Sequence, residues 1–264
     1  MYTINQYVKL KSLEEAYELN QKRMNAVLGG TLWLRLGSRA IQTAIDLSGL
    51  GLDQIEETEE AFVIGCMTPL RVLEQSEALN AWTQGAVRDC ISSIVGTQFR
   101  NMATIGGTIF GRFGFSDVLT CLLVLDTEVV LYKGGRKKLA DFVKEKPDRD
   151  ILVQIVIKKT KRSTGYEAFR LAATDFPVLT CAVSRSAEGK VRTAVGARPN
   201  KAFLIEDEDE LLMGARTEEG IEKYLEFVGA KLTYGSNMRG SAEYRRALTG
   251  VLIRRALEKA SREV

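Results

Sequence analysis

The stretch Thr104-Ile105-Gly106-Gly107-Thr108 decides how the fold of this chain is interpreted, together with the earlier stretch Leu28-Gly29-Gly30-Thr31-Leu32-Trp33. Paired glycines let a backbone approach a ligand closely, and their N–H groups can point at phosphate oxygens. A single Gly-Gly-Thr sequence is more often a plain turn. Two of them in neighbouring strand–helix blocks favour loops that bind a bridged diphosphate, such as that of a dinucleotide.

Neither stretch matches G-x-G-x-x-G or G-x-x-x-x-G-K-[ST], so the Rossmann and P-loop folds are disfavoured. Ser116 and Asp117 follow the second stretch, and two interpretations of this pair stay open. The Asp117 carboxylate can accept hydrogen bonds from a ribose or ribityl hydroxyl or from a ring N–H. The pair fits equally well as the cap of an apolar helix over 118–125.

The elements around these stretches indicate an α+β fold. Short apolar or β-branched runs predict strands, and they lie at 25–28, 43–47, 61–65, 128–132 and 151–157. A turn at 186–189 between runs at 180–185 and 190–196 predicts an antiparallel hairpin. Capping patterns predict one helix after Ser12 and another that begins at Pro69, with Thr68 as its cap. A further helix is expected over 79–87.

The segment 241–264 predicts a closing helix with an apolar stripe. The stripe consists of Tyr244, Leu248, Val251 and Leu252. The opposite face carries Arg245, Arg246, Arg254 and Lys259. We expect that basic face to be solvated, and contact with a partner subunit is the alternative.

The composition excludes several classes of chemistry. The chain has no histidine, which rules out a Ser-His-Asp triad, a His-ligated zinc site and an imidazole general base. Its 37 basic and 34 acidic residues leave a net charge of +3, without the dense basic stripe that is typical of nucleic-acid binding. We therefore expect no nucleic-acid partner.

The cysteines and the apolar runs predict a reduced, soluble and cytoplasmic protein. Cys66, Cys90, Cys121 and Cys181 form no C-x-x-C pair, so we expect buried thiols and no metal site. The opening MYTINQYVKL lacks the apolar core of a signal peptide, and no apolar run reaches the ~20 residues of a membrane span.

With these features in view, the sequence resembles the FAD subunit of the molybdenum hydroxylases, of the xanthine dehydrogenase and carbon monoxide dehydrogenase type. The segment Asn101-Met102-Ala103-Thr104-Ile105-Gly106-Gly107-Thr108, followed by Ser116-Asp117, resembles the flavin signature of that family. The stretch 28–33 resembles its Ala-Gly-Gly-Thr-Asp-Leu pattern. The turn 195–199 and the segment 239–257 are similar to its Gly-x-x-x-x-Pro turn and its closing helix.

The resemblance covers essentially the whole chain and implies its architecture. A FAD-binding unit of the vanillyl-alcohol-oxidase/MurB type would occupy 1–158, with two α+β subdomains at about 1–52 and 53–158. A small C-terminal domain with an antiparallel sheet and helices would occupy 159–264.

The resemblance also implies roles for individual residues. The FAD diphosphate would be wrapped by Leu28, Gly29, Gly30, Thr31, Leu32 and Trp33. The diphosphate and adenosine side would be bound by Thr104, Gly106, Gly107 and Thr108, with Asp117 nearby. Ile94 would pack against the adenine end and Leu152 near the cofactor, and Arg170 matches a basic position beside it.

Three positions depart from the family pattern. Leu32 replaces a frequent Asp and Thr108 replaces a frequent Asn, although backbone donors remain at both. The segment 111–115 is bulkier and more basic than is common in the family. We expect its Arg112 to be a surface residue, and contact with the cofactor is the alternative.

The resemblance implies an electron-transfer subunit of an oxidoreductase such as xanthine dehydrogenase. FAD would receive electrons from iron–sulfur clusters on one partner chain of a heterotrimer and pass them to NAD or another acceptor. A further partner would bind molybdopterin. This division of labour agrees with a chain that has neither histidine nor clustered cysteines. Two alternatives are a stand-alone MurB-like flavoenzyme and a scaffold with a degenerate flavin site.

Overall fold

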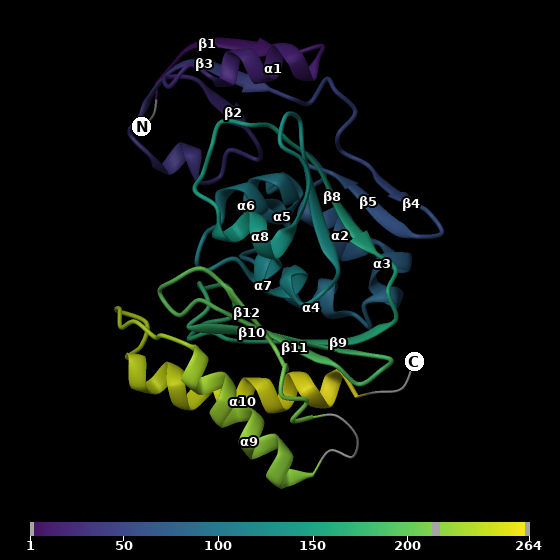
Figure 1. Cartoon of the computed structure of the whole chain (residues 1–264). Helices are drawn as coiled ribbons and strands as arrows, with labels where there is room; N and C mark the ends of the chain where they lie inside the picture. Colours follow the sequence, from purple (N-terminus) through teal and green to yellow (C-terminus); the bar gives the residue numbers. More distant parts are fainter. Residues whose placement is uncertain (1–2, 213–216, 262–264) are drawn as a thin grey trace. The chain divides into compact units, whose positions relative to one another are not determined.

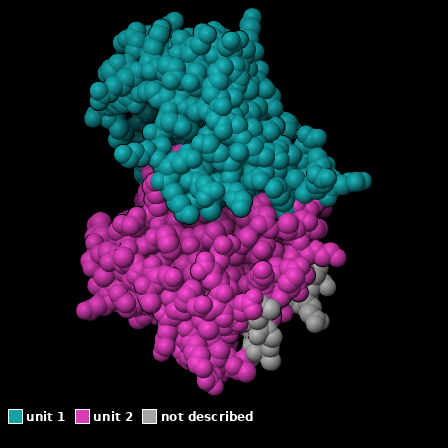
Figure 2. Space-filling view, in the orientation of Figure 1, with its two compact units in different colours: residues 1–73, 97–111, 127–158 teal, residues 74–96, 112–126, 159–264 magenta. Residues whose placement is uncertain are grey.

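A computed structural model describes residues 3–212 and 217–261 (Figure 1). The chain forms two compact units, each built from segments that are separated in sequence (Figure 2). Unit 1 comprises residues 1–73, 97–111 and 127–158, and unit 2 comprises 74–96, 112–126 and 159–264. Among the described residues, no helix is both long and apolar enough to cross a membrane.

Unit 1 contains a small parallel sheet and a larger antiparallel one. The parallel sheet has the order β1-β3-β2, formed by β1 (Thr3–Lys9), β3 (Ala40–Asp46) and β2 (Ala26–Leu28). Helix α1 (Leu13–Asn20) connects β1 to β2, and the Ser12 side chain caps it by accepting from the Glu15 N–H at 3.2 Å. The capping pattern after Ser12 therefore predicted this helix correctly.

The larger sheet of unit 1 has the order β4-β5-β8-β6-β7, and all its neighbours are antiparallel. Its strands are β4 (Ile55–Glu57), β5 (Ala61–Gly65), β8 (Leu152–Lys158), β6 (Thr127–Leu131) and β7 (Gly135–Lys138). The helices around it are α2 (Leu70–Gln75), which ends in unit 2, α5 (Thr97–Met102), α6 (Ile105–Gly111) and α8 (Leu139–Lys144). Helix α2 begins at Leu70 instead of Pro69, because Pro69 forms an isolated bridge with Thr104.

Unit 2 is a four-stranded antiparallel sheet with helices on both faces (Figure 1). The sheet has the order β12-β11-β10-β9, formed by β12 (Phe203–Glu206), β11 (Val191–Gly196), β10 (Leu179–Ser186) and β9 (Arg162–Phe169). The helices are α3 (Glu77–Trp82), α4 (Ala86–Ser92), α7 (Asp117–Leu123), α9 (Glu218–Lys231) and α10 (Ala242–Lys259).

Alternation along β10 explains this layering. Cys181 and Val183 share one hydrophobic core with Tyr224 of α9 and Leu252 of α10. Residues of the other face point toward α7, where the Thr180 hydroxyl lies 2.9 Å from that of Thr120. A strand that is buried on both faces consists of a continuous run of apolar or small residues, as 179–184 does.

The expected apolar stripe of the closing helix is only partly buried. Leu252 is buried and Leu248 packs against the same core, as expected, but Tyr244 and Val251 are each 44% exposed. The buried face of the helix consists of Arg245, Thr249, Leu252, Ile253, Ala256 and Leu257. Arg245 has no solvent exposure, so the expectation that it is solvated is also wrong.

Arg245 is buried because main-chain carbonyls surround its guanidinium. Its Nε donates to the Val178 carbonyl at 2.9 Å, and its Nη1 donates to the carbonyls of Gly235 at 2.7 Å and Gly240 at 2.5 Å. Its Nη2 donates to Oδ1 of Asn237 at 2.6 Å. The helix turns toward these acceptors, since an unsatisfied buried charge costs more than the exposure of Tyr244.

We predict that Arg245→Ala lowers the free energy of unfolding by about 3 kcal/mol or more, because several buried acceptors lose a charged donor. Urea denaturation measures this. The matched control is Arg255→Ala on the exposed face of α10. That control changes stability by no more than about 0.5 kcal/mol. Equal effects of the two substitutions would contradict the role of Arg245.

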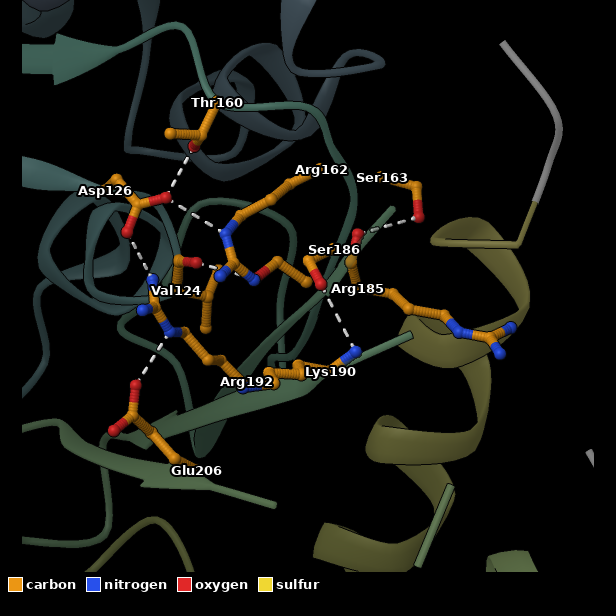
Figure 3. Close-up of polar contacts among 11 residues, drawn as sticks. Val124, Asp126, Thr160, Arg162, Ser163, Arg185, Ser186, Lys190, Arg192 and Glu206 are labelled. Atoms are coloured by element: carbon orange, nitrogen blue, oxygen red, sulfur yellow. Dashed lines mark hydrogen bonds and ion pairs between the residues drawn. The ribbon is translucent and has the colours of Figure 1, made fainter. Parts of the chain in front are cut away.

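One end of the unit 2 sheet carries a charge cluster around Asp126 (Figure 3). The Asp126 carboxylate accepts from Arg192 Nη1 at 2.6 Å, Arg162 Nε at 3.1 Å and the Thr160 hydroxyl at 2.5 Å. Arg192 also donates to Glu206 at 2.8 Å. Burial alone would raise the pKa of Asp126, but the bonds from Thr160, Arg192 and Arg162 lower it to about 2.

The low pKa of Asp126 predicts an acid-dependent loss of stability. A carboxyl whose pKa is lower in the folded chain stabilises the fold above its ordinary pKa of 3.8, and that stabilisation disappears as pH falls through 2. We expect wild type to exceed Asp126→Asn by about 1–2 kcal/mol near neutral pH, after allowance for solvent screening. Unfolding curves between pH 6 and pH 2 would refute this if the difference stayed constant.

Candidate flavin site

The first glycine stretch forms a loop directly after strand β2 in unit 1. Strand β2 ends at Leu28, and the loop continues into a short 3₁₀ turn over Leu34–Leu36. Thr31 has a φ of 59°, a left-handed backbone conformation that residues other than glycine rarely adopt. The Leu32 side chain is buried at 7% exposure, whereas Trp33 is 39% exposed. Leu32 thus packs inward.

Close backbone packing joins the two glycine stretches, which the sequence places far apart. A Cβ on Gly30 would lie 1.9 Å from the Met102 carbonyl oxygen, and one on Gly29 would lie 2.9 Å from Oγ1 of Thr104. Both distances are shorter than real Cβ contacts. The glycines therefore allow the first loop to rest directly on the second stretch.

Four consecutive backbone donors of the first loop are available to a ligand. Within residues 3–212 and 217–261, no group accepts a hydrogen bond from the N–H of Gly29, Gly30, Thr31 or Leu32. Main-chain donors left without protein partners beside a glycine-rich loop make a suitable concave site for phosphate oxygens. We call residues 29–32 the diphosphate cradle.

The second stretch is not a loop, contrary to expectation. Gly106, Gly107 and Thr108 lie in the first turn of α6, which begins at Ile105. The N–H of Gly106 donates to the Cys66 carbonyl at 2.8 Å, and that of Gly107 donates to Oγ1 of Thr104 at 3.2 Å. The N–H of Thr108 donates to the Thr104 carbonyl at 3.2 Å. These donors serve the protein itself, so this stretch shapes the site mainly by allowing close approach.

Gly106 and Gly107 differ in what surrounds them. A Cβ on Gly106 would lie 2.4 Å from the Cys66 carbonyl oxygen, so this glycine is required by the fold. Gly107 is exposed, and its Cβ would meet only Oγ1 of Thr104, at 3.1 Å. Its free side faces the space beyond the protein surface, where a ligand can lie.

Two predicted site residues meet in unit 2. Oδ1 of Asp117 lies 2.5 Å from Nη2 of Arg170 and accepts from the Tyr166 hydroxyl at 2.5 Å. The Arg170 and Asp117 side chains are only 8% and 6% exposed. Burial raises the pKa of Asp117, and Arg170 and Tyr166 oppose that rise. Ser116, not Asp117, caps α7, because its side chain accepts from the Leu119 N–H at 3.1 Å.

Tyr166 is a site residue that the sequence interpretation missed. It lies on β9, and alternation places it on the same face as Ala168 and Arg170. Burial raises its pKa well above 10, and the neighbouring Asp117 charge adds to this, so the hydroxyl stays protonated and donates. The even spacing of four residues between Tyr166 and Arg170 was the available sequence signal.

A polar pocket of about 230 Å³ adjoins this group in unit 2. It is lined by Asp89, Ser92, Ser93, Tyr166, Glu167, Ala168, Arg170 and Lys259. Lys259 Nζ lies 2.8 Å from Asp89 and 3.0 Å from Glu167, and donates to the Tyr166 carbonyl at 3.1 Å. Lys259 is therefore an internal tie between α10 and β9, not part of a solvated basic face.

The remaining predicted residues fall in separate places. Leu152 is buried at the start of β8 in unit 1, and Ile94 is half-buried just after α4 in unit 2. Arg112 is only 3% exposed and has a φ of 47°. The expectation of a surface arginine at 112 is therefore wrong. All four cysteines are buried thiols, as their apolar surroundings indicated.

Comparison with protein families assigns both halves of the sequence. Residues 2–159 match the FAD binding domain in molybdopterin dehydrogenase, and residues 164–260 match the CO dehydrogenase flavoprotein C-terminal domain. The chain belongs to the molybdopterin dehydrogenase FAD-binding family. Its cofactor is FAD, and the diphosphate cradle with its open N–H groups and glycine packing fits the diphosphate of that cofactor.

Individual relatives are similar in sequence over most of the chain. The chain is 28% identical to protein YgfM of Escherichia coli K12, covering 95% of this chain and 94% of YgfM. It is 26% identical to the nicotine 6-hydroxylase medium subunit of Paenarthrobacter nicotinovorans, covering 96% of each. It is 27% identical to the carbon monoxide dehydrogenase medium chain of Afipia carboxidovorans, over 82% of this chain and 80% of that one.

Solved structures of the family have the same fold. A Cu,Mo-CO dehydrogenase chain superposes with a TM-score of 0.86 at 25% identity, covering 98% of both chains. A chain of quinoline 2-oxidoreductase from Pseudomonas putida 86 superposes at 0.82 with 17% identity, covering 98% of this chain and 96% of that one. The expected two-part α+β fold of this family is confirmed.

We predict that Gly107→Val weakens FAD binding at least tenfold, equivalent to about 1.4 kcal/mol, because the new side chain projects to the ligand side. Fluorescence titration of the apoprotein with FAD measures this, and the melting temperature should stay near that of wild type. Gly30→Ala is the contrasting variant, since its clash with Met102 destabilises the fold itself. Wild-type FAD affinity in Gly107→Val would contradict the role of Gly107.

Proposed function

We propose that this chain is the electron-transfer subunit of a multi-subunit molybdenum hydroxylase, in which it holds FAD between an electron donor on a partner chain and an external acceptor. The proposal depends on one observation above all, the four consecutive open N–H groups at Gly29–Leu32. They offer what a diphosphate requires, without any general acid or base. When bound, FAD supplies the redox chemistry by exchanging electrons singly or in pairs.

The residues of this chain bind and orient the cofactor. The backbone of the diphosphate cradle donates hydrogen bonds to the diphosphate, and the exposed face of Gly107 leaves room beside it. We propose that Asp117 fixes the guanidinium of Arg170 and that Tyr166 holds Asp117 in place, because Arg170 and Tyr166 both donate to Oδ1 of Asp117. A guanidinium fixed in this way would favour electron-rich forms of a flavin ring bound beside it, which is the role that the family pattern implies for Arg170.

We propose that the partners are an iron–sulfur subunit and a molybdopterin-binding subunit, in a cytoplasmic heterotrimer. The medium chains that this sequence resembles belong to proteins named for nicotine, carbon monoxide and glyceraldehyde. The substrate therefore varies while this type of chain is retained, so we place substrate choice on the molybdenum subunit. Xanthine and related purines are one candidate substrate class, and NAD is one candidate acceptor.

We also propose that residues 1–158 act as the flavin-binding domain and residues 159–264 as the C-terminal domain. In the first of these, residues 28–33 would bind the diphosphate, and residues 104–108 would give the cofactor room to approach. The hydroxyl of Tyr166 stays bound to Asp117, so it is poorly placed as the proton donor that a stand-alone MurB-like enzyme needs.

Reconstitution tests the proposed function. The full chain is expected to take up FAD with a visible flavin absorbance, and co-expression with the iron–sulfur and molybdopterin chains of its source organism should give a stable complex. In that complex, substrate should bleach the flavin only when the iron–sulfur chain is present. A colourless chain that takes up no FAD would refute cofactor binding, and a yellow chain that joins no such partner would favour a stand-alone flavoenzyme.

A further inference from the structure

The turn that leads into the diphosphate cradle is held by the side chain of one distant arginine. Arg149 Nη1 donates to the carbonyls of Asn20 at 2.7 Å and Lys22 at 3.2 Å, and its Nη2 donates to that of Arg23 at 3.0 Å. These carbonyls lie at the end of α1 and just beyond it, where helical carbonyls lack intrahelical partners. One guanidinium therefore satisfies three acceptors in the segment that precedes β2.

The same contact is made in the opposite direction. The Asn20 side chain donates to the Arg149 carbonyl at 2.8 Å, and the Gln21 side chain donates to it at 3.0 Å. Asn25, only 2% exposed, donates from its side chain to the Leu19 carbonyl at 2.7 Å. The turn is thus fixed up to the residue before β2, and β2 ends at the cradle.

The residue after Arg149 is hydrogen-bonded to the turn between β6 and β7 in unit 1. The adjacent Asp150 carboxylate accepts from the N–H groups of Gly134 at 2.6 Å, Ile151 at 2.7 Å and Lys133 at 3.1 Å. Strand β8 begins two residues after Asp150, at Leu152. The Arg149 guanidinium therefore connects the five-stranded sheet to the turn at residues 20–23.

A second arginine closes the base of the loop from its other side. Arg39 Nη2 donates to the carbonyl of Arg23 and, at 3.2 Å, to that of Asn25. Arg39 follows the cradle in sequence, whereas Arg23 and Asn25 precede it. Both ends of the loop that carries the cradle are consequently tied to each other and to Arg149.

The two arginines keep their charges uncompensated. Within the described part of the chain, neither guanidinium forms an ion pair with a carboxylate. Residues 21–45 contain four basic residues and no acidic one. Positive charge thus collects around a loop whose open N–H groups suit an anion.

We propose that Arg39 and Arg149 form an arginine clamp that positions the diphosphate cradle for FAD, with Arg149 as the main positioning residue. This inference rests on the proposed role of the cradle. Arg149 acts through the backbone of residues 20–28 and not by touching the cofactor.

Amide hydrogen exchange of the full chain tests the clamp without ligand. In Arg149→Ala we expect exchange over residues 20–28 to accelerate about tenfold or more, since three charged hydrogen bonds are lost, while β9–β12 exchange as in wild type. The matched control is Arg136→Ala, whose side chain is 58% exposed and lies 3.4 Å from Glu128. It should leave residues 20–28 unchanged. Unchanged exchange of 20–28 in Arg149→Ala, or equal acceleration throughout the chain, would overturn the clamp.

FAD titration gives the second arm. Arg149→Ala should bind FAD at least tenfold more weakly, Arg149→Lys should be intermediate, and added methylguanidinium should restore part of the affinity of Arg149→Ala. Restoration by a free guanidinium group is not expected from general destabilisation. Wild-type affinity in Arg149→Ala would overturn the inference. A wild-type chain that binds no FAD would refute the role of the cradle. The hydrogen-exchange experiment would still test whether Arg149 holds the turn, because it needs no ligand.

Discussion

The approach of Gly30 to the Met102 carbonyl is the constraint on which the flavin-binding part of unit 1 depends. No side chain fits between these two backbones, so the loop after β2 and the start of α6 share one surface. Among the described residues, the N–H groups of residues 29–32 have no protein acceptor, while the donors at the start of α6 are used internally. One loop therefore offers hydrogen bonds, and the other provides a surface that a ligand can approach.

Guanidinium groups hold the chain together at several points. Arg245 and Arg149 each donate to several main-chain carbonyls, whereas Arg170 and Arg192 pair with carboxylates. Because arginine stays charged in proteins and the chain lacks histidine, none of these ties depends on a group whose ordinary pKa lies near neutrality. The ties that Arg149 and Arg245 make to main-chain carbonyls are consequently insensitive to pH in the physiological range.

Local patterns predicted many elements correctly. The run 61–65 is a strand with those bounds, and the hairpin about 186–189 and the helix capped by Ser12 are present as expected. These succeeded because apolar periodicity and capping depend on neighbours in sequence. The buried face of the closing helix was predicted only in part. The carbonyls that accept from Arg245 belong to residues 178, 235 and 240, and periodicity within the helix cannot show them.

The glycine pairs, the absence of histidine and the family pattern by themselves establish an FAD-binding chain with no histidine-based acid–base chemistry. The use of each donor depends on packing between distant segments. Gly106 donates to Cys66 and Asp117 accepts from Arg170, so these two bind the protein itself, while Gly29–Leu32 remain open to a ligand. The sequence shows which donors and acceptors exist. A donor is satisfied only where folding brings an acceptor to it, so the tertiary structure decides which donors bind the protein and which can bind a ligand.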